Sequence, residues 1–169
     1  DRTNQFNVIP GVNLDKNPRI DLVFDTDHLT DAYVFVKITY GDAWSYASNT
    51  FTGKVNNGTK TALTTKINTS NWSVHAEGAG FVVLLYKGEN SADNVGSNNL
   101  TDKSILAYSY PDASDVANKK TIKVESGLLE AECEWIRDNS SKFNLDFKAY
   151  AIQSSGLTPA KAWDQVANK

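Results

Sequence analysis

Apolar and polar residues alternate with a period of two in segment after segment of this chain, and no other feature constrains its fold as strongly. In the segment 142–153 the apolar positions fall on one face, and they are Phe143, Leu145, Phe147, Ala149 and Ala151. Because successive side chains of a strand point to opposite faces of a sheet, this pattern predicts a strand with one buried side. Further strands are predicted at 19–25, 31–41, 61–68, 71–77, 80–88, 105–110, 120–125 and 128–137.

The number and spacing of these strands predict the fold class. About nine short strands separated by Gly, Asn, Asp and Ser turns indicate an all-β antiparallel β-sandwich of jelly-roll type. The strand 31–41 is apolar on both faces at first, so we expect it in the middle of a sheet. The strand 128–137 is expected to carry Cys133 inward beside Trp135, as a small buried hydrophobe. The polar stretch 88–104 is expected to be a long loop.

A short C-terminal helix is the one helix that the sequence predicts. Thr158 is a good N-cap, and Pro159 follows at the first helical position. Leu157, before the cap, can pack on Ala162 as a hydrophobic staple. The helix is therefore expected to lie on the sandwich as a buttress, without chemistry of its own.

Length and charge limit the class of protein. At 169 residues, 40% of them hydrophobic, the chain suits one globular domain, which we place at 10–169. The net charge is −3 and the 17 basic residues form no run, so the charge pattern of a nucleic-acid binder is missing. No stretch approaches the roughly 20 apolar residues of a membrane span. The single cysteine, Cys133, excludes an internal disulfide.

The sequence carries no recognisable catalytic motif. His28 and His75 lie outside any His-Glu-X-X-His pattern, and no Gly-X-Ser-X-Gly elbow occurs. Asp25, Asp27 and Asp31 form an oxygen-rich loop of a kind that can hold Ca²⁺, but without the spacing of an EF-hand, so a solvated turn is expected. We therefore expect a protein that is not an enzyme and has no catalytic residue, metal or cofactor.

Three aromatic residues offer an alternative function. Trp44 and Tyr46 lie two apart and could face the same way, with Trp72 in another segment. Exposed aromatic rings of this kind can stack on sugars. The alternative hypothesis is thus a monomeric, cell-surface carbohydrate-binding module, although the same rings could instead close the end of the sandwich.

The first nine residues are set apart from the rest. The segment 1–9 has Phe6 and Val8 as its same-face apolar residues, and Pro10–Gly11 separates it from the remainder of the chain. A short, polar terminal segment is ordinarily frayed unless it pairs with a sheet. It could pair with an edge of its own sandwich or with an adjacent subunit, which would generate a head-to-tail filament.

Four motifs follow one another along the two ends of the chain. They are N-x-F-x-V-x-PG ending at Gly11, DKNPRIDLVFD at 15–25, DAYVFVKI at 31–38 and FKAYAIQSSGLTPAKAWDQV at 147–166. This order resembles the TasA/camelysin-like family, which Gram-positive bacteria export through SipW-type signal peptides. The resemblance covers both ends of the chain, and the middle, 39–139, carries no matching motif.

The resemblance implies a secreted, jelly-roll subunit of extracellular biofilm-matrix fibres. The segment 1–9 would then be a donor strand that completes the sheet of the next subunit, with Phe6, Val8 and Ile9 at the subunit interface. The implied partner is the protein itself, in a head-to-tail filament, with other matrix proteins or cell-surface polymers as further partners. Camelysin-like members are classed as metallopeptidases, but this chain lacks a zinc motif, so an unusual hydrolase remains only a third hypothesis.

Overall fold

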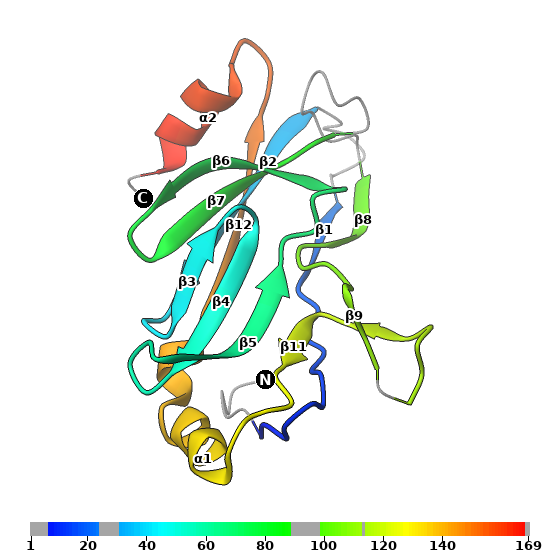
Figure 1. Ribbon diagram of the computed structural model, residues 1–169. Helices are drawn as coiled ribbons and strands as arrows, with labels where there is room; N and C mark the ends of the chain where they lie inside the picture. Colours follow the sequence, from blue (N-terminus) through cyan, green and yellow to red (C-terminus); the bar gives the residue numbers. More distant parts are fainter. Residues whose placement is uncertain (1–6, 24–30, 89–98, 113, 168–169) are drawn as a thin grey trace. The chain divides into compact units, whose positions relative to one another are not determined.

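The chain is mostly antiparallel β-sheet with two short α-helices in its described part (Figure 1). The structure, a computed structural model, describes residues 7–23, 31–88, 99–112 and 114–167. The chain divides into two compact units. Unit 1 comprises Asp1–Asn17, Thr39–Asn68 and Leu106–Asp146, and unit 2 comprises Pro18–Ile38, Thr69–Ile105 and Phe147–Lys169. The predicted all-β class with a C-terminal helix is confirmed, and the jelly-roll connectivity stays a prediction.

Unit 1 contains a four-stranded antiparallel sheet in the order β11-β5-β4-β3. Its strands are β3 (Trp44–Ala47), β4 (Thr50–Val55), β5 (Lys60–Lys66) and β11 (Ile122–Val124). A tight turn joins β3 to β4, and Ser48 and Asn49 there have φ of 49° and 64°, as a type I′ hairpin turn requires. Along β4 buried and half-buried residues alternate, with Phe51 and Val55 fully buried, so one face of this sheet forms the core of unit 1.

A helix replaces the strand predicted at 128–137, so that prediction is wrong. Unit 1 also contains α1 (Glu130–Asp138), η1 (Ser140–Phe143) and the short strand pair β9 (Tyr110–Pro111) and β10 (Lys119–Lys120). Burial recurs at Leu128, Glu132 and Ile136, and a spacing of four places side chains on one face of a helix. Cys133 is consequently half-buried on a helix and does not face the inside of a sheet.

Unit 2 contains the second four-stranded sheet, in the order β12-β2-β7-β6. Its strands are β2 (Ala32–Tyr40), β6 (Trp72–Gly78), β7 (Phe81–Tyr86) and β12 (Leu145–Gln153). The prediction of a central strand at 31–41 is confirmed, because β2 lies between β12 and β7 and residues Ala32 to Val36 are all buried. A separate antiparallel pair joins β1 (Arg19–Val23) to β8 (Asn99–Ser104).

The predicted C-terminal helix, α2 (Pro159–Val166), is confirmed and covers part of the unit 2 sheet. The Thr158 side chain accepts a hydrogen bond from the Lys161 N–H, and Pro159 occupies the first turn. Ala162 is buried in a cluster with side chains of β2 and β7, against which Leu157 and Trp163 also pack. The helix is held on the sheet by this apolar contact and by the Tyr33 hydroxyl, which donates to the Leu157 carbonyl at 2.8 Å.

Several other expectations are corrected. Residues 99–104, predicted as loop, form β8, and residues 44–55 form a hairpin where no strand was predicted. The strand predicted at 105–110 is mostly irregular, with an isolated bridge from Leu106 to Ile67. Ala149 and Ala151 of β12 are exposed, where the alternation predicts them inward. In the described ranges neither α1 nor α2 has the length and apolar character that crossing a membrane requires.

Candidate functional site

The segment after Pro10 lies along the edge of the unit 1 sheet. Leu14 and Ile122 exchange two backbone hydrogen bonds, of 2.8 and 2.9 Å, and form an antiparallel bridge. The Gly11 N–H donates to the Glu125 carbonyl at 3.2 Å. Since β11 pairs with β5 on its other side, this segment covers the outer edge of β11 in its own chain.

Side chains supply the hydrogen bonds that this irregular pairing lacks. The Thr121 hydroxyl donates to the Lys16 carbonyl at 2.8 Å and accepts from the Lys16 N–H at 2.7 Å. The Asn13 amide oxygen accepts from the Val124 N–H at 3.0 Å, and its nitrogen donates to the Pro111 carbonyl at 2.7 Å. The alternation of 120–125 predicts Thr121 outward, and that prediction is wrong because Thr121 is buried by these contacts. Residues after Gly11 are therefore part of the subunit's own fold.

The segment before Pro10 behaves differently. Within its described part, residues 7–9 form no strand, and the Val12 N–H donates back to the Ile9 carbonyl at 3.0 Å across the Pro10–Gly11 turn. Gly11 has φ of 77°, a left-handed conformation that favours glycine and lets the chain turn here.

The three predicted interface residues have different surroundings. Val8 is 9% exposed and lines a hollow of about 230 Å³ with Asn7 and with α1 residues Glu130, Cys133, Glu134 and Arg137. Ile9 is 59% exposed, and Phe6 lies outside the described residues. Val8 is thus covered by its own chain, whereas Ile9 is open to a partner.

The surface of α1 beneath Val8 is fixed by one buried carboxylate. The Glu132 side chain accepts a hydrogen bond from the Lys60 ammonium at 2.8 Å and another from the Leu129 N–H at 2.8 Å. Lys60 also donates to the Gly127 carbonyl at 2.9 Å, so it ties β5 to the start of α1. The hydrogen bond from Lys60, followed by that from Leu129, holds the pKa of Glu132 below its ordinary value of 4.5.

The lowered pKa of Glu132 predicts acid sensitivity. Because the folded state favours the ionised carboxylate, its contribution to stability is complete above pH 4.5 and is lost as the pH falls through the lower folded pKa. We expect Glu132→Gln to reduce the loss of unfolding free energy between a pH of about 6 and about 3.5. Glu130→Gln, an exposed change in the same turn, is the control. Urea unfolding at both pH values measures the difference, and an unchanged pH dependence in Glu132→Gln would contradict this role.

The surroundings of the half-buried Cys133 disfavour its thiolate form. Burial raises its pKa, and the neighbouring carboxylates of Glu132 and Glu130 raise it further. Since the thiolate is the nucleophilic form, a raised pKa makes this thiol less reactive at neutral pH.

The alternative carbohydrate platform does not fit the burial of its two tryptophans. Trp44 is 4% exposed and its indole N–H donates to the Phe143 carbonyl at 2.9 Å. Trp72, which belongs to unit 2, is fully buried and donates to the Ser104 carbonyl at 3.0 Å. Tyr46 is half-buried, with its ring 4.9 Å from that of Phe51. The alternative hypothesis needs open ring faces on Trp44 and Trp72, and their burial contradicts that requirement.

Of the residues considered for metal binding, Asp31 and His75 lie in the described part of the chain. No group of three or more His, Cys, Asp or Glu side chains that could hold a metal occurs in the described part of the chain. His28, Asp25 and Asp27 lie outside the described residues. His75 lies on β6 with its ring 5.2 Å from that of Phe35, and burial lowers its pKa, an effect that the Asp164 carboxylate opposes.

The sequence singles out the segment 1–9 as a candidate but does not reveal the residues that anchor the chain on the C-terminal side of Pro10–Gly11. Asn13, Leu14 and Thr121 carry those contacts. The signal in the sequence is the alternation of Val12 and Leu14 directly after the turn. It is typical of an extended segment, and in the structure Leu14 pairs with the edge of β11. Comparison of the chain with family models, curated proteins and solved structures found no match.

Proposed function

We propose that this protein is a secreted structural subunit of extracellular, biofilm-matrix filaments, in which the N-terminal segment of one subunit pairs with a sheet of the next. The observation that supports the proposal is the change at Pro10–Gly11. C-terminal to this turn, the chain is hydrogen-bonded along the edge of β11. N-terminal to it, residues 7–9 form no strand and Ile9 is 59% exposed. A segment that forms no strand in its own subunit is suited to strand addition, which satisfies the edges of both partners.

Assembly by this route has one identifiable cost. To enter a neighbouring sheet, Val8 must leave the surface of α1, and exposing a buried valine costs about 1.5–3 kcal/mol. The ladder hydrogen bonds and the burial of Ile9 and Phe6 in the neighbour would have to offset that cost. The contact between Val8 and α1 would therefore favour the monomer until a free sheet edge is encountered.

Electron microscopy of the purified chain beside a variant lacking Asp1–Ile9 tests the proposal. We expect filaments from the intact chain and a folded, monomeric truncation, because the contacts of Leu14, Lys16 and Thr121 lie behind the deletion. Filaments from the truncated variant, or none from the intact chain over a range of pH and salt, would count against it.

A pair of point variants gives a sharper prediction. Ile9 and Val12 are both apolar and exposed, at 59% and 49%, and they flank the same turn. Ile9→Asp should reduce filament formation strongly, because a buried, unpaired carboxylate in the neighbour is costly, while Val12→Asp should leave it unchanged. Neither change should lower the melting temperature of the monomer by more than a few degrees. Equal filament yields from the two variants would contradict the proposed interface.

A further inference from the structure

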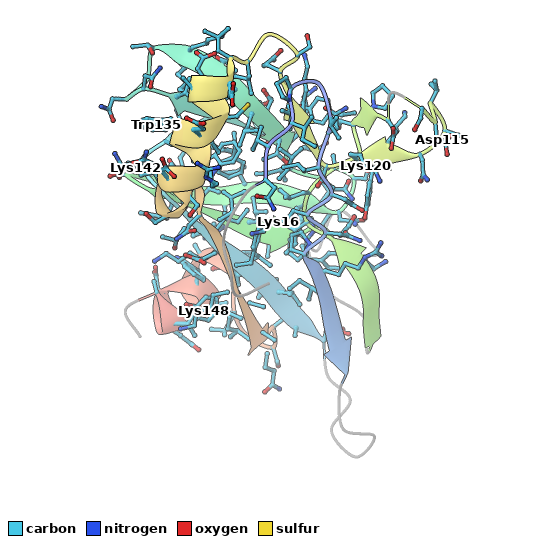
Figure 2. The ribbon with its side chains drawn as sticks, turned by 90° about the horizontal axis from the view of Figure 1, so that it is seen from below. Lys16, Asp115, Lys120, Trp135, Lys142 and Lys148 are labelled. Carbon is cyan, nitrogen blue, oxygen red and sulfur yellow. The ribbon has the colours of Figure 1, made fainter. Side chains whose placement is uncertain are left out.

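A hollow in unit 1 brings together an indole and two lysines that the assembly proposal does not use. Its volume is about 390 Å³, and it lies between the start of β3, the β4–β5 turn, α1 and η1. The residues that line it include Asp42, Ser45, Lys54, Asn57, Trp135 and Lys142. Figure 2 shows Trp135 and Lys142 next to each other along the α1–η1 ribbon.

Trp135 provides an apolar surface that is held in place. Its ring meets the buried ring of Phe143 edge-on, with centroids 5.9 Å apart and planes at 87°. The indole remains partly exposed on the side of the hollow, and the Lys142 ammonium lies 5.4 Å from its centroid. An anchored aromatic ring beside a cation suits a ligand with both an apolar face and a negative charge.

The charge of the hollow points in the same direction. Among the described residues, no carboxylate lies within 4.0 Å of the ammonium of Lys54 or of Lys142. Among the described residues that line the hollow, Asp42 is the one with a carboxylate. Both lysines can thus turn toward a bound anion, while Asp42, Ser45 and Asn57 supply hydrogen-bonding groups suited to hydroxyls.

The walls of the hollow are fixed by backbone hydrogen bonds. The Ala43 N–H donates to the Lys142 carbonyl at 3.0 Å, and the Lys54 N–H donates to the Ala43 carbonyl at 3.0 Å. In the β4–β5 turn the Gly58 N–H donates to the Val55 carbonyl at 3.2 Å. The site is therefore largely formed before a ligand arrives, which lowers the entropic cost of binding.

We infer that this hollow binds an acidic oligosaccharide, with a sugar ring packed on Trp135 and a carboxylate held by Lys54 and Lys142. A neutral sugar would gain nothing from the two lysines, and an acidic peptide would make less use of the hydroxyl-binding groups beside the indole. The inference is independent of filament formation, because residues 7–9, the described part of the segment 1–9, do not line the hollow.

Titration of the full chain with tetragalacturonate, followed by calorimetry, tests the inference. The probe is compared with a neutral galactose tetrasaccharide of the same linkage and with a glutamate tetrapeptide. We expect the acidic sugar to bind at least about tenfold more tightly than either. Its affinity should fall as the salt concentration rises from about 0.05 M to about 0.3 M. No binding of the acidic sugar, or equal binding of any two of the probes, would overturn the inference.

Variants locate the binding on the protein. Lys54→Gln and Lys142→Gln should each weaken tetragalacturonate binding several-fold, and Trp135→Ala should weaken it by about tenfold or more. Lys119→Gln, an exposed change on β10, should have no effect. Because Trp135 also supports Phe143, Trp135→Phe is the second variant, which keeps that contact but offers a smaller stacking surface. Affinity unchanged in both lysine variants would place the ligand elsewhere.

Discussion

Replacing Phe143 with alanine is expected to lower the free energy of unfolding by about 3–5 kcal/mol. Phe143 is fully buried, and its ring meets Trp44 and Trp135 edge-on, with centroids 6.0 and 5.9 Å away. An ideal Cβ on Gly53 would lie 3.2 Å from the Phe143 ring, so the packing around it is close. Because two large, anchored indoles cannot easily move into the space left behind, the alanine variant should retain a cavity.

Guanidinium unfolding followed by tryptophan fluorescence measures this loss. Phe143→Leu, which keeps most of the apolar volume, should lose clearly less, and Val116→Ala, at a position 75% exposed, should change little. A loss below about 1 kcal/mol in Phe143→Ala would show that the indoles close over the gap. Phe143→Ala should also lower the affinity for a ligand that packs on Trp135, since it removes the contact that fixes the indole.

The strands could be predicted from sequence wherever the pattern of apolar residues fits a strand and no other element. The run from Phe81 to Tyr86 is continuous, apolar and bounded by glycines, and it is a buried strand as predicted. The residues from Ala32 to Val36 are apolar on both faces, and only a central strand accommodates that pattern. In these cases local propensity and burial favour the same element.

The segment 130–138 fits two periods, and the strand period that we predicted is the wrong one. Leu129, Cys133 and Trp135 alternate with glutamates as a strand would, but the buried residues Glu132 and Ile136 recur with the helical spacing. Glutamate and alanine are depleted in strands and favour helices, a signal that should have outweighed the alternation. The strand pattern predicts Trp135 on an inward face, whereas on the helix it lines a hollow at the surface.

The end of β12 shows a different limit. After Phe147 both faces carry apolar residues, so alternation alone cannot say which face is covered. In the structure the larger Tyr150 and Ile152 are partly buried against the cluster under α2, whereas Ala149 and Ala151 are exposed. Tertiary packing decides between the two faces, since covering the larger side chains removes more apolar area from water.

The boundary of the candidate assembly segment can be predicted from a turn, whereas the contacts around it cannot. Pro10–Gly11 is visible in the sequence, and the chain does change its surroundings there. Hydrogen bonds between residues more than 100 positions apart, such as those that join Lys16 to Thr121, leave no local signal. The indoles of Trp44 and Trp72 likewise donate to distant backbone carbonyls, so the sequence alone could not decide between an exposed sugar platform and rings that close the end of the sandwich.

A second large effect is expected from Gly41→Ala. The added Cβ would lie 2.4 Å from the carbonyl oxygen and 2.6 Å from the carbonyl carbon of Lys142, and both are backbone atoms that cannot rotate away. The turn between β2 and β3 would have to separate from η1 and lose the hydrogen bond from the Gly41 N–H to the Asn144 carbonyl at 3.0 Å. We expect a loss of about 3 kcal/mol or more in unfolding free energy.

Two further glycines separate the clash from other effects of adding a methyl group. An ideal Cβ on Gly127 meets nothing within 4 Å, so Gly127→Ala should change stability by less than about 1 kcal/mol. Gly58 is equally open but has φ of 98°, so Gly58→Ala should cost about 1–2 kcal/mol from backbone strain alone. The urea midpoint should therefore be highest for Gly127→Ala, lower for Gly58→Ala and lowest for Gly41→Ala. If Gly41→Ala is no worse than Gly58→Ala, η1 can move away from the turn, and the wall of the hollow that Lys142 forms is not rigid.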